Sequence, residues 1–196
     1  MSPKSQVCAG MDPFPEERFA ARVGRVDDLV QTGAALEAVI ATLPAWRRKK
    51  CEGLMFEADR RRSVAVWLLL EQMRAKLGNL PFSLSHSEDR VMVAISESPV
   101  GCDIEKIAPV KDGIMEEALT PAELRFVYAQ PTSIERSEAF YRLWTRKESY
   151  VKAIGKGFAV GPTTFSVLPE ASPRGAKFYD YPVADGYLAS VCVLIK

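Results

Sequence analysis

The sequence predicts an α+β protein, because helical and extended patterns alternate in blocks along the chain. A largely helical stretch from about residue 15 to residue 78 precedes short apolar strands, and the second half again places helices before strands. The 196 residues, 47% hydrophobic and 26% charged, fit one globular domain or two small joined ones. The halves share only a faint echo in sequence, FSLS…VMVAIS and FSVL…ASVCVL.

The first block is predicted from helix signals. Pro15-Glu16-Glu17 is typical of a helix start, with an early proline followed by acids. Apolar residues recur at helical spacing from Asp59 to Leu77, and Gly78 ends the pattern. A first strand is expected over residues 5–11 (SQVCAGM).

The remaining elements follow in order. PFSLS and RVMVAIS predict a hairpin, and VGCDIE predicts a third strand. Thr120, with a proline after it and Glu123 three residues on, predicts a capped helix start. A longer helix is expected from about Ser137 to Ile154, ended by Gly155. Closing strands are expected at TTFSVL, AKFYDY and YLASVCVLI.

Charge, hydropathy and cysteine usage argue against several kinds of partner and site. A net charge of +1 argues against nucleic acid or a membrane surface as a partner. The longest apolar run, VAVWLLL, is too short to cross a bilayer, and the first ten residues show no signal peptide. The four cysteines form no CxxC pair, which argues against a zinc or dithiol site and for a reducing cytoplasm.

The strand VGCDIE carries two carboxylates in an apolar setting. Side chains alternate along a strand, so Cys102 and Ile104 face one way, and Gly101, Asp103 and Glu105 face the other. Neighbouring carboxylates repel and raise each other's pKa, and a hard cation such as Mg²⁺ relieves that conflict. The alternative is an edge strand whose charges point into solvent.

The long predicted helix carries an unusual lysine. Its apolar arc consists of Phe140, Leu143, Trp144, Val151 and Ile154. Lys147 falls inside that arc, so its ammonium either reaches out to solvent or points into an anion site. Glu148 and Lys152, four residues apart at the edge of the arc, form either a surface ion pair or part of the same site.

Basic residues cluster in two further places. His86, the one histidine, lies in Ser85-His86-Ser87 and is either a surface residue or a phosphate contact. Arg47 and Lys50 share a helix face, either solvated or acting as a phosphate clamp.

Arg62 and Ser63 follow the basic cluster on the next helix. Together these groups describe a site for a phosphate-rich ligand, although no P-loop and no GxGxxG motif is present.

GCDIE, followed about forty residues later by WTRKESYVK, resembles the paired signature of the 4'-phosphopantetheinyl transferases. The resemblance is to the larger pseudo-dimeric type that includes the surfactin synthetase-activating enzyme. The signature positions are filled by Gly101, Asp103, Glu105, Trp144, Lys147, Glu148, Ser149 and Lys152. FSLSHS, RRKKCEGLMFEADRRRS and GKGFAVGPTTFSV match further stretches of the family, so the resemblance covers about residues 45–166.

The resemblance implies a fold of two similar α/β subdomains related by a pseudo-two-fold axis, each a small, mostly antiparallel sheet packed on helices. The active site would lie in the cleft between them. Residues 1–100 would form the N-terminal subdomain with the basic helix and the Ser-His-Ser hairpin. Residues 101–196 would form the C-terminal subdomain with the metal strand and the Trp-x-x-Lys-Glu helix.

The resemblance also implies a reaction. The enzyme would move 4'-phosphopantetheine from coenzyme A to a serine of an apo acyl or peptidyl carrier protein, with Mg²⁺, releasing adenosine 3',5'-bisphosphate. The implied metal ligands are Asp103, Glu105 and Glu148. The implied catalytic residues are Glu148, Lys152 and Asp103, with Glu148, a metal-coordinated water or Lys152 as the base.

The residues implied to bind coenzyme A are Arg47, Lys50, Arg62, Ser63, Ser85, His86, Lys147 and Lys152. In this assignment Arg47 and Lys50 hold the 3'-phosphate, Ser63 lies near the adenine, and Lys147, Lys152 and His86 contact the pyrophosphate.

One segment departs from the family, because only LGNLPF (residues 77–82) stands where the family has a longer adenine-lining stretch. By analogy the carrier would dock after the metal strand on Ile107, Ile114, Met115, Leu119 and Phe126, although these residues could equally be core. The enzyme is expected to be a monomer. The alternatives are a non-catalytic protein that binds coenzyme A or a carrier, and an unrelated Mg²⁺-dependent phosphohydrolase.

Overall fold

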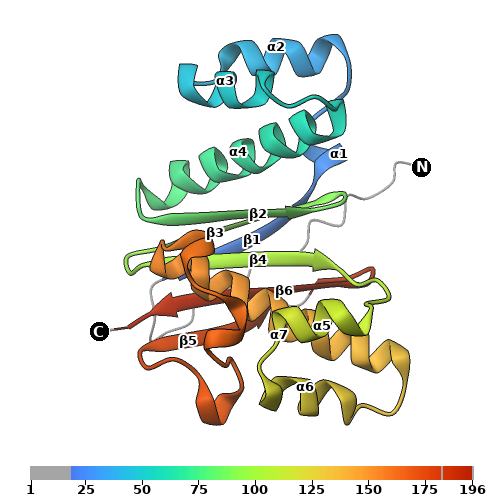
Figure 1. Cartoon of the computed structure of the whole chain (residues 1–196). Helices are drawn as coiled ribbons and strands as arrows, with labels where there is room; N and C mark the ends of the chain where they lie inside the picture. Colours follow the sequence, from blue (N-terminus) through green and yellow to red (C-terminus); the bar gives the residue numbers. More distant parts are fainter. Residues whose placement is uncertain (1–18, 182, 196) are drawn as a thin grey trace, which may run out of the picture.

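The computed structural model describes residues 19–181 and 183–195, and it confirms the α+β class. Two small antiparallel sheets lie against each other, with helices on their outer faces (Figure 1). None of the helices in these ranges is long and apolar enough to cross a membrane.

The N-terminal unit contains one sheet and four helices. Its elements are β1 (Phe19–Arg25), α1 (Val26–Leu29), α2 (Ala34–Thr42), α3 (Ala45–Glu52), α4 (Glu57–Leu77), β2 (Phe82–Ser87) and β3 (Arg90–Ser96). The strand order β1-β3-β2 places β3 in the centre, and β3 is buried along its whole length.

The C-terminal unit repeats this plan. Its elements are β4 (Val100–Lys106), α5 (Asp112–Ala118), α6 (Pro121–Tyr128), α7 (Ser133–Ile154), three short 3-10 turns, β5 (Ala176–Tyr181) and β6 (Tyr187–Leu194). The strand order β4-β6-β5 again puts the last strand between the first and the second. A shared topology of strand, helices and two strands fits the pair of similar units that the resemblance predicted. The division at residues 100 and 101 stays a prediction.

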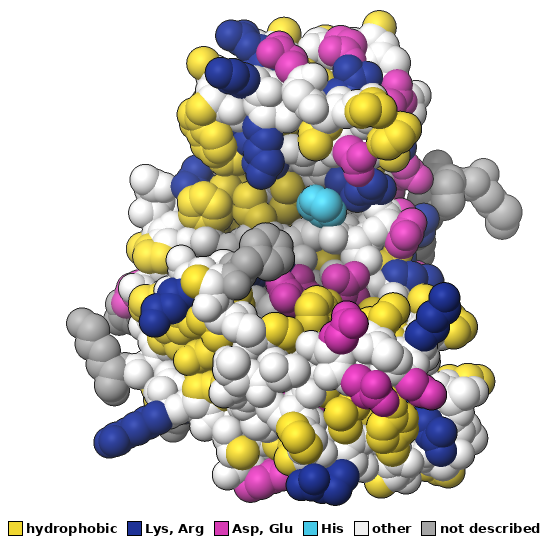
Figure 2. Space-filling model, in the orientation of Figure 1, with side chains coloured by type: hydrophobic (Ala, Val, Ile, Leu, Met, Phe, Trp, Pro, Cys, Tyr) yellow, Lys and Arg dark blue, Asp and Glu magenta, His cyan; other side chains and the backbone are white. Residues whose placement is uncertain are grey.

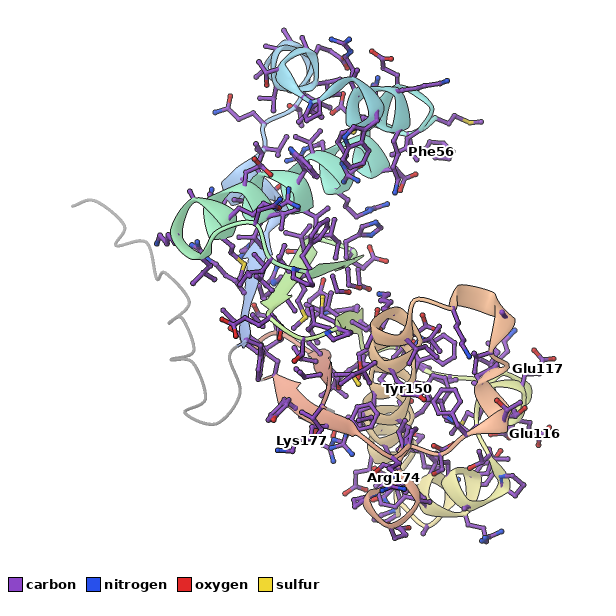
Figure 3. All side chains as sticks on the ribbon, turned by 90° about the vertical axis from the view of Figure 1, so that its left-hand side faces the viewer. Phe56, Glu116, Glu117, Tyr150, Arg174 and Lys177 are labelled. Carbon is purple, nitrogen blue, oxygen red and sulfur yellow. The ribbon has the colours of Figure 1, made fainter. Side chains whose placement is uncertain are left out.

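The core is arranged in layers. One face of the first sheet packs on α4, and its other face packs on the second sheet through residues such as Met92 and Ala94. The second sheet contributes Cys102, Ile104 and Val191 to that shared layer. Helix α7 covers the opposite face of the second sheet (Figure 1). The turned view shows Phe56 projecting from the start of α4 and Tyr150 on α7 (Figure 3).

Helix starts on the C-terminal side follow the expected chemistry. Thr120 caps α6 in a reciprocal capping box with Glu123, and Thr132 caps α7 in the same way with Glu135. Gly155 ends α7 in the left-handed conformation at φ 66°. The capped start of α6 and the end of α7 were both predicted, and both are confirmed.

Two secondary-structure predictions are wrong. Residues 19–25 were expected to be helical but form β1, because Phe19 and Ala21 alternate into the layer between the sheets. TTFSVL was expected to be a strand, but residues 162–164 form a 3-10 turn. That segment is held by a lysine side chain from α7 instead of a strand ladder, as described below. The predicted strand at residues 5–11 and helix start at 15–17 lie outside the described residues.

Candidate active site

Strand β4 separates core from site as its alternation predicts. Cys102 and Ile104 are fully buried between the sheets, whereas Asp103 faces α7 and is 3% exposed. A Cβ atom at Gly101 would lie 1.8 Å from the carbonyl oxygen of Ser149, so only glycine lets α7 approach so closely. Asp103 is therefore not the solvated edge-strand charge of the alternative interpretation.

Asp103 and Lys152 form an ion pair at this contact. The Lys152 ammonium donates to Asp103 Oδ1 at 2.7 Å, to the Cys102 carbonyl at 3.1 Å and to Ser85 Oγ at 3.2 Å. An ammonium has three donors, so this set occupies all of them. Burial alone would lower the pKa of Lys152, but the negative charge of Asp103 raises it on balance. Lys152 is therefore held as a cation, which makes it a poor base.

Two further carboxylates share this region. Burial, and next the charge of Asp103, raise the pKa of Glu105 to about 7. Burial and the charge of Asp103 also raise the pKa of Glu148. The carboxylates of β4 and α7 thus lie close enough together that the charge of one disfavours ionisation of the others.

The carboxylates fit a hard cation in their chemistry. Within the described residues, Asp103 Oδ2 is buried and has no hydrogen-bond partner. An orphaned carboxylate oxygen beside two carboxylates of raised pKa is a donor set that suits Mg²⁺. In their present arrangement, however, the described residues contain no group of three or more His, Cys, Asp or Glu side chains that could hold a metal ion. Lys152 instead contacts Asp103 Oδ1.

Lys147 is a correction to the predicted site. Its side chain is 1% exposed, and its ammonium pairs with Glu123 at 2.8 Å. The same ammonium donates to the carbonyls of Pro162 and Phe165, each at 2.6 Å. All three donors are used by groups that lie neither on β4 nor in the lining of the cationic pocket described below, so the structure does not bring Lys147 to the proposed anion site.

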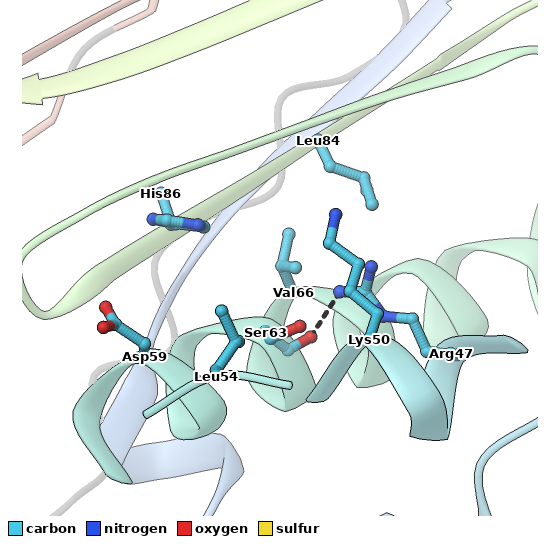
Figure 4. A pocket seen from close by; sticks show the side chains of 8 residues that line it. All are labelled: Arg47, Lys50, Leu54, Asp59, Ser63, Val66, Leu84 and His86. Carbon is cyan, nitrogen blue, oxygen red and sulfur yellow. Dashed lines mark hydrogen bonds between the residues drawn. The ribbon is translucent and has the colours of Figure 1, made fainter. Parts of the chain in front are cut away.

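A pocket of about 200 Å³ gathers the predicted phosphate-binding residues (Figure 4). Its lining consists of Arg47, Lys50, Leu54, Asp59, Ser63, Val66, Leu84 and His86. Helices α3 and α4 provide the polar wall, and β2 provides the wall opposite (Figure 4). The structure therefore brings Arg47, Lys50, Ser63 and His86 together, as the sequence predicted.

The polar residues of the pocket differ in how far they are buried and bonded to other protein groups. Arg47 is 4% exposed, donates to the Ser63 carbonyl at 2.6 Å and lies over the Trp67 ring, whereas Lys50 is exposed. Loss of surrounding water, and next the charges of Arg62 and Lys152, lower the pKa of His86. Arg62 itself is not in this lining: it pairs with Asp59 at the edge of the pocket and lines a neighbouring hollow.

Strand β2 links the pocket to the carboxylates. Leu84 and His86 face the pocket, while Ser85 on the other face donates to Asp103 Oδ1 at 2.8 Å. On the surface, His86 lies near basic side chains, with acidic side chains below it on the same face (Figure 2). Ser85 thus contacts a carboxylate, and Ser87, for which the sequence predicts no role, donates to Glu105 Oε2 at 2.8 Å.

The residues predicted to meet a carrier divide into two groups. Met115 and Leu119 are 3% and 1% exposed and belong to the core. Ile114 and Phe126 are 52% and 39% exposed. Ile107 lines a groove of about 260 Å³ between the segment after β4 and the start of α7. Only part of the predicted set is therefore available to a partner.

The fold and the site together define a class: α+β proteins with two units of like topology, a cationic pocket on the first and a carboxylate cluster on the first strand of the second. Residues 99–192 match the model of the 4'-phosphopantetheinyl transferase superfamily. That range begins just before β4 and ends within β6. The match therefore covers the carboxylates and most of the second sheet.

The curated relatives that the chain matches are also 4'-phosphopantetheinyl transferases. A 4'-phosphopantetheinyl transferase psf-1 of Bacillus pumilus is 42% identical over 43% of this chain and 36% of its own length. The transferase gsp of Aneurinibacillus migulanus is 32% identical over 60% and 53%. The transferase Sfp of Bacillus subtilis (strain 168) is 34% identical over 57% and 54%.

Residues 99–192 are thus similar to the 4'-phosphopantetheinyl transferase superfamily, and the similarity to Sfp and gsp supports the type that the motifs predicted. The chain spans between about a third and just over half of the length of these relatives, with coverages of 36%, 53% and 54%.

Proposed function

We propose that this chain transfers 4'-phosphopantetheine from coenzyme A to a serine of an apo acyl or peptidyl carrier protein, releasing adenosine 3',5'-bisphosphate. One observation carries the proposal: β2 joins a cationic pocket to a carboxylate cluster through successive residues, His86 and Ser85. Coenzyme A offers the matching charges, a 3'-phosphate at one end of its nucleotide and a pyrophosphate at the other.

The metal of the reaction would be held by Asp103, Glu105 and Glu148. The orphaned Asp103 Oδ2 and the raised pKa of Glu105 support this assignment. Bound there, Mg²⁺ would supply positive charge to the phosphoryl oxygens, on which negative charge grows in the transition state. Mn²⁺ is the natural substitute to test, because it also prefers oxygen ligands.

The pocket would bind the nucleotide end of coenzyme A. Lys50 is the exposed cation of the lining and would meet the 3'-phosphate, while Arg47 supports it from a buried position. His86 would contact the pyrophosphate as a hydrogen-bond donor on the other wall. Ser63, whose side chain is buried, lines the same pocket and would lie near the adenine.

The transfer step needs no protein nucleophile. The carrier serine oxygen bonds to the phosphorus that bears pantetheine, and the bond from that phosphorus to the bridging oxygen breaks. The leaving adenosine 3',5'-bisphosphate takes the electron pair. Glu148 takes the serine proton, because a carboxylate of raised pKa holds a proton more readily than an ordinary one. Lys152, held as a cation, would stabilise the leaving phosphate.

The carrier would dock beside the groove that Ile107 and Ile134 line, close to the end of β4. Ile114 on α5 and Phe126 on α6 are further exposed apolar side chains that a carrier could meet. A location in the cytoplasm and a monomeric state remain predictions of the same proposal.

The test is to incubate the full chain with coenzyme A, Mg²⁺ and an apo carrier protein, and to weigh the carrier by mass spectrometry. A mass gain equal to phosphopantetheine is the expected result. No gain with apo acyl and peptidyl carriers that an established transferase modifies would overturn the proposal. Binding of coenzyme A or carrier without mass gain would favour the non-catalytic alternative, and breakdown of coenzyme A without a carrier would favour a hydrolase.

A further inference from the structure

The edges of the two sheets meet along β2 and β4. Each is an edge strand of its own sheet, so β4 presents one row of backbone amides that β6 cannot pair. Three of these amides, at Cys102, Ile104 and Lys106, are met by side chains of β2 instead of by its backbone. The described part of the chain thus joins the two sheets through a ladder of serine hydroxyls.

The ladder has a regular geometry because serines alternate along β2. Ser83 Oγ accepts from the Cys102 amide at 3.0 Å, Ser85 Oγ from the Ile104 amide at 3.4 Å, and Ser87 Oγ from the Lys106 amide at 3.1 Å.

A hydroxyl that accepts an amide proton still has its own proton to donate. Ser87 donates that proton to Glu105 Oε2 at 2.8 Å, and Ser85 donates to Asp103 Oδ1 at 2.8 Å. Among the described residues, Ser83 donates to no carboxylate. Ser85 and Ser87 therefore each bind the acid that directly precedes the amide they accept from. Ser83 binds no such acid.

We propose that Ser87 is a positioning residue that orients the Glu105 carboxylate for a divalent cation, with Ser85 doing the same for Asp103. This inference rests on the proposed function only in taking these acids as metal ligands. By binding one oxygen of each carboxylate, the serines fix its plane and direct the second oxygen away from β2. Asp103 shows the consequence, because Oδ1 receives Ser85 while Oδ2 is left without a partner among the described residues.

The inference makes the N-terminal unit responsible for aligning ligands that the C-terminal unit carries. Groups that hydrogen-bond to metal ligands typically change metal affinity by about 10–100-fold when removed. A purely structural ladder would show a different pattern, since Ser83 caps β4 as the other two serines do and would matter equally.

The experiment measures Mn²⁺ binding to the full chain by electron paramagnetic resonance, with inorganic pyrophosphate present, so that no transfer is required. Four proteins are compared: wild type, Ser87→Ala, Ser87→Thr and Ser83→Ala. Ser87→Ala is expected to weaken Mn²⁺ binding about 10–100-fold, and Ser87→Thr, which keeps the hydroxyl, is expected to restore most of it. Ser83→Ala is expected to bind Mn²⁺ as wild type does. Thermal unfolding of each variant measures separately how much the lost contact between β2 and β4 destabilises the chain.

Unchanged Mn²⁺ binding in Ser87→Ala would overturn the inference. So would an equal loss in Ser83→Ala, or a wild-type chain that binds no Mn²⁺. The outcomes remain separable from those of the proposed function. Wild-type phosphopantetheine transfer combined with unchanged Mn²⁺ binding in Ser87→Ala would contradict the positioning role alone. Serine-dependent Mn²⁺ binding without any transfer would contradict the transferase alone.

Discussion

Two lysines on α7, five residues apart, end in opposite environments. Lys147 pairs with Glu123, and the two side chains are 1% and 0% exposed. Lys152 pairs with Asp103, and these side chains are 30% and 5% exposed. The first ammonium is enclosed by protein groups, whereas the second borders the surface that carries His86 and the acidic side chains.

The comparison separates a contact that holds the fold from one that can serve chemistry. Glu123 also accepts hydrogen bonds from the Thr120 and Val167 amides, so the Lys147 pair ties α6, α7 and the segment after α7 together. Asp103 instead keeps an orphaned oxygen, and its lysine partner is partly open to solvent. A buried pair that is fully satisfied resists exchange, while the open pair can change partners when a ligand arrives.

The largest expected effect comes from breaking the open pair. Asp103→Ala should reduce transfer at least about a thousandfold, because the phosphoryl charge loses its electrostatic stabilisation, and Glu148→Ala should do likewise. The measurement is the rate of carrier mass gain at saturating coenzyme A. Both variants should remain folded by circular dichroism. Near-normal rates in either would contradict the assignment of these acids.

Breaking the enclosed pair should instead affect stability. Glu123→Gln leaves Lys147 buried without its countercharge and should lower the free energy of unfolding by about 3–5 kcal/mol. Urea denaturation measures this loss. Adding Lys147→Met to Glu123→Gln should recover part of it, because no unpaired charge is then buried and the glutamine oxygen can still accept from one of the two amides. Transfer per folded molecule should stay near wild type in the double variant, and a large loss would return Lys147 to the site.

A smaller effect is expected at the cationic pocket. Lys50→Ala should raise the KM for coenzyme A about 10–100-fold, the range expected for one charge-assisted hydrogen bond. Lys49→Ala is the matched control, since Lys49 is exposed on the same helix but absent from the pocket lining. The KM for 3'-dephospho-coenzyme A should be alike in Lys50→Ala and wild type. An equal rise for both nucleotides would show that Lys50 does not meet the 3'-phosphate.

The elements that the sequence predicts correctly are those whose local pattern agrees with their contacts in the folded protein. The capped start of α6, the end of α7 and the alternation of β4 are written in short stretches of sequence, and the structure has all three. Residues 19–25 were misassigned because the alternation of Phe19 and Ala21 is short, and it becomes a strand only through pairing with β3, far along the chain. Residues 163–168 were misassigned because their tether is Lys147.

The same limit applies to the site. Helical spacing showed that Lys147 lies in an apolar arc, but its partner Glu123 comes from another helix that spacing cannot place. Ser87 lies in the same Ser-His-Ser motif as Ser85, yet its contact with Glu105 depends on how two sheet edges meet. A signal was available: serine at every second position of a strand, facing a strand with acids at every second position.

The smallest expected effect concerns pH and Glu105. Its folded pKa is raised to about 7, above its ordinary value, so the folded state disfavours the ionised form. The stabilising contribution of the protonated group is therefore fully present below the unfolded pKa and is lost as pH rises through about 7.

Glu105→Gln keeps an acceptor for Ser87 but removes the charge. Without added metal, it should stabilise the chain at pH 8 by about 1–2 kcal/mol, after allowance for solvent screening, and by much less at pH 5. Thermal unfolding at both values tests this, and saturating Mg²⁺ should reverse the order at pH 8, because only the carboxylate binds the cation strongly. A gain that is equal at both pH values would show that the Glu105 charge is not the cause.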